Sequence, residues 1–317
     1  MLSSAWHYFL LSAPLFVIVL IGFMIGAWRC WQPRWTSLAS KIVFAVILPA
    51  MLFRLMSDLH GVPPVDARLL IAFFGGCFVV FAIGRMVGAW AFRLDGVSQS
   101  VFALGGIFSN NVLLGLPIAK MTLGEGAVPA VALVIVFNAL TLWTLVSVSV
   151  EWARHGSFSI AGFGKMALGV ITNPVVAGIV AGTLFGLSGW SLPGPVHWML
   201  DGLADLAAPA ALLVLGMGLA EYGIKRDWQL SVAVTTLKLF VQPCAVWIIG
   251  LLLGLPPLEL QAVVLLASMA VGANVYLMAM QFQVLQGPIA SSLVLSTALA
   301  ALTTPLILAA MHAVTNR

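Results

Sequence analysis

The sequence predicts an all-α membrane protein of about ten transmembrane helices, arranged as two inverted five-helix repeats with broken, crossing helices 4 and 9. Three observations support this fold class. Of the 317 residues, 62% are hydrophobic and 8% are charged, against roughly 25% charged residues in an ordinary soluble domain. Apolar stretches of roughly 20 residues, each long enough to cross a bilayer, recur along most of the chain. The two halves of the sequence also share a weak internal similarity.

The apolar runs between charges, prolines and glycines place the predicted helices. Lipid offers no water to peptide groups, so only helices or closed barrels span it, and these runs are too long for barrel strands. The first run lacks a basic leader and precedes Arg29 and Arg34, which indicates a retained helix rather than a cleaved signal peptide. The predicted ranges are 8–28, 37–59, 68–92, 99–120, 127–151, 165–187, 197–220, 229–254, 259–283 and 288–313.

The distribution of basic residues predicts the topology, because cytoplasmic loops carry more lysine and arginine. The loops after helices 1, 3, 5 and 7 hold Arg29, Arg34, Lys41, Arg93, Arg154, Lys165, Lys225 and Arg226. The opposite side holds Arg68, Lys120 and Arg317. We therefore expect a multi-pass protein of the bacterial inner membrane with both termini in the periplasm. Scattered basic residues of this kind do not predict nucleic-acid binding.

A shift of 160 residues aligns the two halves of the chain. It pairs Pro14 with Pro174, Gly22 with Gly182, Gly26 with Gly186 and Pro49 with Pro209. Each half holds five helices, an odd number, so the second half must enter the membrane upside down, which defines an inverted repeat. The glycine pairs give helix 1 and helix 6 each a face of small residues, which predicts close backbone approach of a neighbouring helix. The alternative is chance, because the chain holds 30 glycines.

Two helices contain clusters of helix-weakening residues at expected membrane depth. Helix 4 runs through Gly105, Gly106 and Ser109 to Pro117, and helix 9 holds Gly272 near its centre. We expect interruptions near 108–112 and 271–275 that meet at the midplane. Because lipid cannot satisfy free peptide groups, both breaks must be buried in protein or line a watered cavity. We further expect helix breaks at four prolines: Pro49, Pro117, Pro209 and Pro243.

The interrupted helices are the predicted substrate site, because paired breaks in corresponding helices mark such sites in transporters. A helix that restarts at midplane directs free N–H groups and partial positive charge toward it, which favours an anion. The amides of Asn110, Asn111 and Asn274 add neutral donors and acceptors. Alternatively, these asparagines only bend the helices and bond to the backbone. The predicted substrate contacts are Asn110, Asn111, Val112, Gly272, Asn274 and Tyr276.

Charged residues at membrane depth are costly and are therefore candidates for function. Arg85 lies near a helix end and can extend to the interface. Arg54 has Asp58 one helical turn away, so an intrahelical pair is the alternative to a functional role. Lys238 lies deep in helix 8 without an acid at i±4, and Asp205 lies in helix 7. Lys238, Asp205 and Arg54 are candidates for coupling or charge compensation, and each could instead only tie helices together.

Catalytic and metal sites are not expected. Cys30, Cys77 and Cys244 are far apart and match neither a disulfide framework nor a metal spacing. The sequence holds no HExxH or GxSxG motif and no paired intramembrane aspartates, which argues against a membrane enzyme. We expect no cofactor, and coupling of transport to protons or sodium.

An ordered set of short motifs runs through nearly the full length of the chain. The set is Leu48-Pro49-Ala50 with Leu52-Phe53, Asn110-Asn111 with Gly115-Leu116-Pro117 and Gly124-Glu125, Asn173-Pro174, Ala208-Pro209 with Leu215-Gly216 and Leu219, and Lys238-Leu239 ahead of Pro243. With these motifs the chain resembles the auxin efflux carrier family, which includes plant auxin exporters and bacterial malonate and malate permeases. The resemblance implies an inverted-repeat fold like that of the bile acid:sodium symporters.

The resemblance also implies a two-part carrier with an elevator-type mechanism. Residues 1–63 and 165–226 would form a scaffold, and residues 64–164 and 227–317 would form a moving transport unit. Asn111 and Asn274 match the asparagines that hold the substrate carboxylate in the plant relatives. The implied function is secondary transport of a small organic anion such as malonate or malate, with lipid around the protein and a homodimer through the scaffold helices. The alternatives are a channel or uniporter-type facilitator for a small solute, or a membrane sensor without transport.

Overall fold

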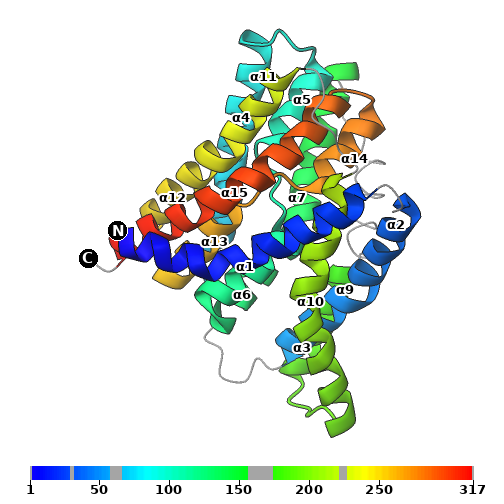
Figure 1. Ribbon diagram of the computed structural model, residues 1–317. Helices are drawn as coiled ribbons and strands as arrows, with labels where there is room; N and C mark the ends of the chain where they lie inside the picture. The colour runs from blue at the N-terminus through cyan, green and yellow to red at the C-terminus, as the bar shows by residue number, and fades with distance from the viewer. Residues whose placement is uncertain (1, 29–31, 58–65, 156–173, 221–226, 316–317) are drawn as a thin grey trace. The chain divides into compact units, whose positions relative to one another are not determined.

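The computed structural model describes residues 2–28, 32–57, 66–155, 174–220 and 227–315, and each of these ranges is largely helical (Figure 1). The α-helices are α1 (Leu2–Ala27), α2 (Pro33–Ile42), α3 (Leu48–Ser57), α4 (Arg68–Trp90), α5 (Gly96–Gly105), α6 (Leu116–Leu123), α7 (Val128–His155), α9 (Pro174–Leu187), α10 (Gly194–Ala220), α11 (Trp228–Thr236), α12 (Gln242–Leu252), α13 (Pro257–Ala267), α14 (Ala273–Phe282) and α15 (Gln286–Thr315). Within the described ranges the only β pairing is one antiparallel bridge, between Ser109 and Val271. The predicted all-α class is confirmed.

Short segments of other helical types complete the chain. Three are π-helical, namely η1 (Val43–Ile47), η2 (Asn111–Gly115) and η4 (Leu237–Val241), and η3 (Glu125–Ala127) is a 3-10 turn. Each π segment joins α-helices or begins one, so that α2, η1 and α3 form one continuous span, and α11, η4 and α12 form another.

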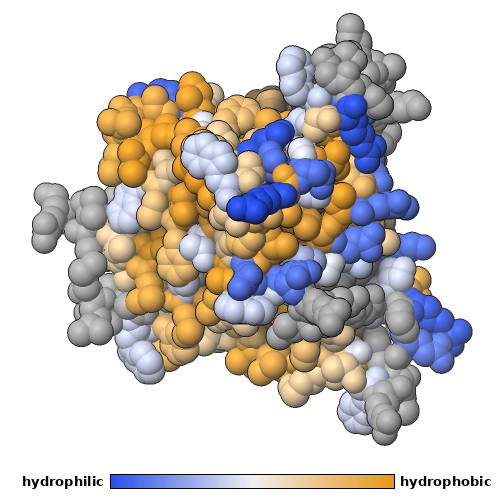
Figure 2. All heavy atoms as spheres, turned by 90° about the horizontal axis from the view of Figure 1, so that it is seen from above, coloured by the Kyte–Doolittle hydropathy of each residue, from blue (hydrophilic) through white to orange (hydrophobic). Residues whose placement is uncertain are grey.

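Six helical segments are long and apolar enough to cross a membrane. They are Arg34–Ser57, Arg68–Trp90, Glu125–Arg154, Gly194–Ala220, Trp228–Leu252 and Gln286–Met311, and shorter apolar helices cover Ala13–Ala27, Asn111–Leu123, Pro174–Leu187 and Pro257–Ala267. Figure 2 shows hydrophobic side chains over much of one face, with hydrophilic side chains gathered toward its centre and right. The chain is therefore a multi-pass membrane protein. The ten-span inverted arrangement stays a prediction, and the expected start of helix 6, at 165–173, lies outside the described residues.

The chain folds into two compact units. The first unit comprises residues 1–13, 66–164 and 222–317, and the second unit comprises residues 14–65 and 165–221. The boundary in α1 falls at Pro14, a residue that cannot donate a helical hydrogen bond. The assignment of these units as transport unit and scaffold, which the family resemblance implies, stays a prediction.

Glycines set the close packing of the second unit. α9 packs on α3, and a methyl group built on Gly182 would lie 2.5 Å from the carbonyl oxygen of Phe53. Residues 14–27 of α1 pack on α10, and a methyl group on Gly26 would lie 2.7 Å from the carbonyl oxygen of Met217. Gly22 and Gly186 make equivalent approaches to α10 and α3. The close packing predicted for these four glycines is confirmed.

The four prolines expected to break helices lie in continuous helix, which corrects that expectation. η1 ends two residues before Pro49, η2 two residues before Pro117, and η4 two residues before Pro243. Proline cannot bond the carbonyl four residues earlier, and in each case that carbonyl lies inside the π segment, where bonds run from i to i+5. The π turn thus absorbs the missing bond. Pro209 lies within α10, which runs unbroken through it.

The first unit holds the interrupted helices among longer ones. α4 packs against α5 and α12, α7 packs against α5 and α13, and α15 packs against α11 and α14. The start of α5 is fixed by Asp95, whose carboxylate accepts hydrogen bonds from the N–H groups of Val97 and Ser98. A hydrogen bond from the Ser98 hydroxyl lowers the pKa of the Asp95 carboxyl below its ordinary value, so this cap stays charged at neutral pH.

The substitution Gly182→Ala tests the packing of the second unit. The added methyl group would clash with backbone atoms of α3, so we expect a loss of about 1–3 kcal/mol of stability, typical of overpacking. Gly218→Ala is the matched control, because a methyl group at Gly218 in α10 meets nothing within 4 Å. Thermal unfolding of both variants in nanodiscs measures the difference. Equal midpoints would contradict the close packing of α9 on α3.

Candidate functional site

Two helical stretches of the first unit are interrupted. The first stops at the end of α5 and resumes at Asn111 with η2 and α6, and the second stops at the end of α13 and resumes at Ala273 with α14. We expect breaks near 108–112 and 271–275, and the observed ones cover 106–110 and 268–272. Both breaks thus begin two or three residues earlier in the chain than predicted, because Asn111 and Asn274 already belong to the resumed helices. The hydroxyl of Ser268 bonds the Leu265 carbonyl, which competes with helix continuation.

The two interruptions contact each other through backbone hydrogen bonds. The N–H of Asn110 donates to the Ala270 carbonyl at 2.9 Å, and the N–H of Gly272 donates to the Phe108 carbonyl at 2.8 Å. α5 lies beside α14, and α13 lies beside α6, so the two stretches cross at their breaks (Figure 1). Each break therefore supplies the backbone partners that lipid would not supply to the other.

Several polar side chains at the first break are buried without a partner among the described residues. They are the Ser109 hydroxyl, the Asn110 amide nitrogen and both amide atoms of Asn111. These side chains are 2%, 7% and 3% exposed, respectively. A buried polar group without a partner costs about 1–3 kcal/mol, so this concentration in one place indicates a site where a ligand or water supplies the missing bonds.

The resumed helices present free N–H groups at the crossing. Asn110 precedes η2 and Gly272 precedes α14, and neither residue caps its helix with a side chain. The first turns of these helices therefore direct partial positive charge toward the crossing, which favours a negatively charged ligand.

Two side chains of the span Trp228–Leu252 bond to the carbonyl groups at the breaks. The ammonium group of Lys238 donates to the Ala267 carbonyl at 2.5 Å. The amide nitrogen of Gln242 donates to the Ile107 carbonyl at 2.8 Å and lies 3.3 Å from the sulfur of Cys77. Lys238 and Gln242 are both fully buried. Lys238 is thus buried within the first unit, and its described partner is a backbone carbonyl at the end of α13.

The remaining predicted contacts lie on or beside the breaks. Gly272 is buried, and a methyl group there would lie 3.0 Å from the Phe108 ring and 3.1 Å from the Ser109 carbonyl oxygen. Only glycine therefore fits this crossing without displacement of the neighbouring backbone. Val112, Asn274 and Tyr276 are half-buried in the first turns of the resumed helices. Their role as substrate contacts stays a prediction.

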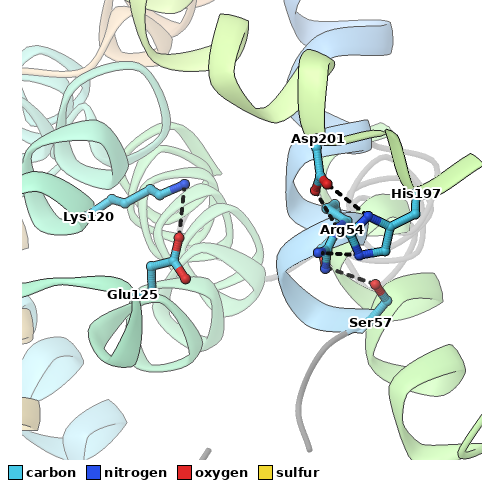
Figure 3. Close-up of polar contacts among 6 residues, drawn as sticks. All are labelled: Arg54, Ser57, Lys120, Glu125, His197 and Asp201. Atoms are coloured by element: carbon cyan, nitrogen blue, oxygen red, sulfur yellow. Dashed lines mark hydrogen bonds and ion pairs between the residues drawn. The ribbon is translucent and has the colours of Figure 1, made fainter. Parts of the chain in front are cut away.

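Arg54 belongs to an ionic cluster of the second unit (Figure 3). Its guanidinium donates to a carboxylate oxygen of Asp201 at 2.7 Å and contacts Nε2 of His197 at 2.8 Å. Nδ1 of His197 lies 2.8 Å from the other carboxylate oxygen of Asp201. Arg54 lies on α3 and the other two lie on α10, so the cluster joins two helices. The predicted alternative partner, Asp58, lies outside the described residues.

Asp205 lies one helical turn beyond this cluster. It is exposed on α10. No described contact joins Asp205 to Arg54, His197 or Asp201, and its role in coupling stays a prediction.

Two other charged groups have local partners in the first unit. Lys120 lies 3.4 Å from Glu125, at the junction of α6 and η3 (Figure 3). The Arg85 guanidinium donates to Ser100, Ser149 and Gln99. Arg85 therefore joins α4 to α5 and α7 through neutral groups rather than extending freely to the interface.

The sequence analysis missed four polar residues that the structure places at or near these sites. Gln242 bonds the first break, Asp201 and His197 bind Arg54, and Asn138 in α7 is 6% exposed with an unpartnered amide oxygen. For Gln242 and Asn138 the available signal was an isolated amide inside a long apolar run. Asp201 and His197 lie near the start of a predicted helix, four residues apart, and only the fold brings them to Arg54.

A metal centre finds no support in the described part of the chain. No group of three or more histidine, cysteine, aspartate or glutamate side chains there is placed to hold a metal ion. Cys77 is buried and Cys244 is exposed, both as free thiols. Cys30 lies outside the described residues.

An apolar, all-helical chain whose interrupted helices cross and hold unpartnered amides has the architecture of a membrane transporter. Comparison with known proteins agrees with this class. The chain belongs to the family described as Membrane transport protein, whose model matches residues 8–159 and 159–308. This match confirms the resemblance to the auxin efflux carrier family, and the protein is a membrane transporter.

Two relatives cover most of the chain. It is 26% identical over 298 residues to a protein of Rhizobium meliloti (strain 1021) named "Putative malonate transporter", covering 92% of each chain. It is 20% identical over 260 residues to an uncharacterized transporter of Methanocaldococcus jannaschii, covering 80% of this chain and 82% of the relative.

A double-mutant cycle on Arg54→Ala and Asp201→Ala tests the ionic cluster. Since the two groups are in contact, we expect the effects of the two substitutions on thermal or chemical unfolding to be non-additive. Asp205→Ala is the matched control, because Asp205 is an exposed aspartate on the same helix. Its effect should add to that of Arg54→Ala without coupling. Similar coupling in both cycles would show that the cluster does not hold α3 to α10.

Proposed function

We propose that this protein is a secondary active transporter that moves a small organic anion, a carboxylate such as malonate or malate, across the inner membrane. The observation that carries the proposal is the crossing of the two interrupted helices, where the buried amide nitrogen of Asn110 and both amide atoms of Asn111 have no described partner. Amide N–H groups and uncapped helix N-termini together form a neutral but electropositive site. Such a site can hold a carboxylate and then release it.

Lys238 supports an anionic rather than a neutral substrate. Its ammonium group has three N–H donors, and among the described residues one carbonyl, that of Ala267, accepts from it. The remaining donors favour a negatively charged or water partner close to the crossing. We propose charge compensation or ion coupling as the role of Lys238, with Arg54 and Asp205 as weaker candidates for coupling, to protons or to sodium. The name of the R. meliloti relative agrees with a small dicarboxylate.

An elevator-type mechanism fits the division of the chain. The crossing and all its described partners belong to the first unit, whereas the glycine-packed helices belong to the second unit. We propose that the first unit moves with the substrate and that the second unit is the scaffold through which two copies form a dimer. In this proposal the transport unit is 64–164 with 227–317, and the scaffold is 1–63 with 165–226.

Other functions compete with this one. A channel would pass solute without counterflow, a uniporter-type facilitator would show counterflow but no accumulation driven by an ion gradient, and a membrane sensor would bind solute without moving it. Purified protein in liposomes separates these functions, because a secondary active transporter shows saturable uptake that internal unlabelled substrate accelerates and that an ion gradient drives. Uptake without acceleration would indicate a channel, acceleration without gradient-driven accumulation would indicate a facilitator, and binding without uptake would indicate a sensor. An uncharged preferred substrate would remove the anion from the proposal.

The variants Asn111→Ala and Asn274→Ala test the site itself. Removing one hydrogen-bonding amide should cost about 1–3 kcal/mol, which is roughly tenfold to hundredfold in affinity. The measurement is binding and liposome uptake of malonate and malate by variants that elute as a single species. Gln281→Ala is the control, because it removes an exposed amide from the same α14 helix. Wild-type affinity in both asparagine variants would exclude these amides from the site.

The predicted topology has a separate test. A cysteine placed at position 3 should react with an impermeant thiol reagent in intact spheroplasts, because we expect both termini in the periplasm. A cysteine near residue 158, in a basic loop, should react only after the cells are opened. The background is a variant without the three native cysteines. The reverse labelling pattern would invert the orientation.

A further inference from the structure

We infer that Lys238 and Gln242 act together as positioning residues that bind both helix breaks to one helix, so that the two breaks are held or released together. We call these two residues the capping pair. The inference rests on the proposed function only where transport is the readout, because the hydrogen bonds of the capping pair do not depend on a substrate.

The carboxyl ends of α5 and α13 both lie in the buried crossing region. The last carbonyl groups of any helix lack partners within it and carry partial negative charge. Gln242 donates to the carbonyl of Ile107 just beyond α5, and Lys238 donates to the carbonyl of Ala267 at the end of α13. One helix thus supplies a donor to each break.

The spacing of the capping pair means that one movement of the helix would affect both hydrogen bonds. Lys238 lies in η4, and Gln242 is the first residue of α12. They are four residues apart, close to one turn, so they project from the same side of the helix. Both are fully buried, so neither side chain is free to follow its carbonyl into solvent. Displacement of this helix would therefore remove both bonds.

The chemistry of the capping pair also serves an anion site. The half-helices that resume after the breaks attract an anion, but the carboxyl ends of α5 and α13 repel it from a short distance. In its protonated form Lys238 places a positive charge at one of these ends and offsets the repulsion. Gln242 satisfies the other end without adding charge. The pair therefore fixes both the shape and the electrostatic balance of the crossing.

A second helix provides an internal comparison. The hydroxyl of Ser296, in α15, accepts a hydrogen bond from the N–H of Val271 at 3.0 Å. This bond holds the second break alone. If local capping were the whole effect, loss of Ser296 and loss of Lys238 would have similar, local consequences.

Hydrogen exchange at single amides, measured on the full-length protein in nanodiscs without substrate, tests the inference. Gln242→Met removes the cap of the first break, and we expect about tenfold faster exchange at Val271 in the second break. Lys238→Met removes the cap of the second break, and we expect similarly faster exchange at Phe108, whose N–H bonds the Leu104 carbonyl in the first break. Ser296→Ala should accelerate Val271 and leave Phe108 unchanged.

The inference is overturned if each methionine variant accelerates only its own break, or if Ser296→Ala accelerates Phe108 as strongly as Lys238→Met does. Should Lys238→Met fail to elute as a single species, Gln242→Met decides alone, because its expected remote effect on Val271 is independent of the lysine. Uptake of malonate by the unsubstituted protein is a separate arm: no uptake, together with the expected remote exchange in the variants, would count against the proposed substrate and not against the capping pair.

Discussion

The requirement that peptide groups find partners inside a membrane controls the site of this protein. A helix broken in lipid would expose N–H and carbonyl groups at a cost of several kcal/mol each. Here the two breaks lie against each other, and each bonds the other through Asn110 and Gly272. Because of this pairing, unwound backbone is tolerated at a depth where it can face a ligand. The side chains of Gln242, Lys238 and Ser296 bond three further backbone groups at the breaks.

Close glycine approaches pack helices in both units, as at Gly84 of α4 against Ala103 of α5, but the first unit also relies on buried polar bonds at its breaks. In the second unit, glycines let the backbones of α1 and α10, and of α3 and α9, approach so closely that a methyl group would clash. In the first unit, buried amides, hydroxyls and one lysine bond to the backbone of neighbouring helices. Van der Waals packing of small residues is insensitive to charge, whereas hydrogen bonds at a break can be exchanged for bonds to a ligand. This difference agrees with a static role for one unit and a ligand-linked role for the other.

Sequence alone predicted the features that depend on residue type and period. The apolar runs gave the helices, and the glycines and asparagines gave the two interruptions to within three residues. The burial of Lys238 agrees with its place in the middle of a long apolar run. Its acceptor could not be predicted, because backbone carbonyls are present at every position and only the fold selects Ala267. The acceptor of Gln242 is likewise a backbone carbonyl that only the fold selects. For Pro49, Pro117 and Pro243 the prediction of helix breaks was wrong because a π turn before each proline accommodates the missing hydrogen bond.

Those π turns affect how the two halves of the chain can be compared. A π turn holds one residue more than the α turn that it replaces, so it acts as a one-residue insertion that the helix absorbs without a loop. The helix with Pro49 has such a turn and the helix with Pro209 has none, although the two prolines are 160 residues apart and correspond in the repeat. An ungapped alignment of the halves therefore drifts by one position across each unmatched π turn. Beyond that point the alignment pairs residues that lie on different faces of the two helices. The halves are therefore best compared segment by segment, with each segment ending at a π turn.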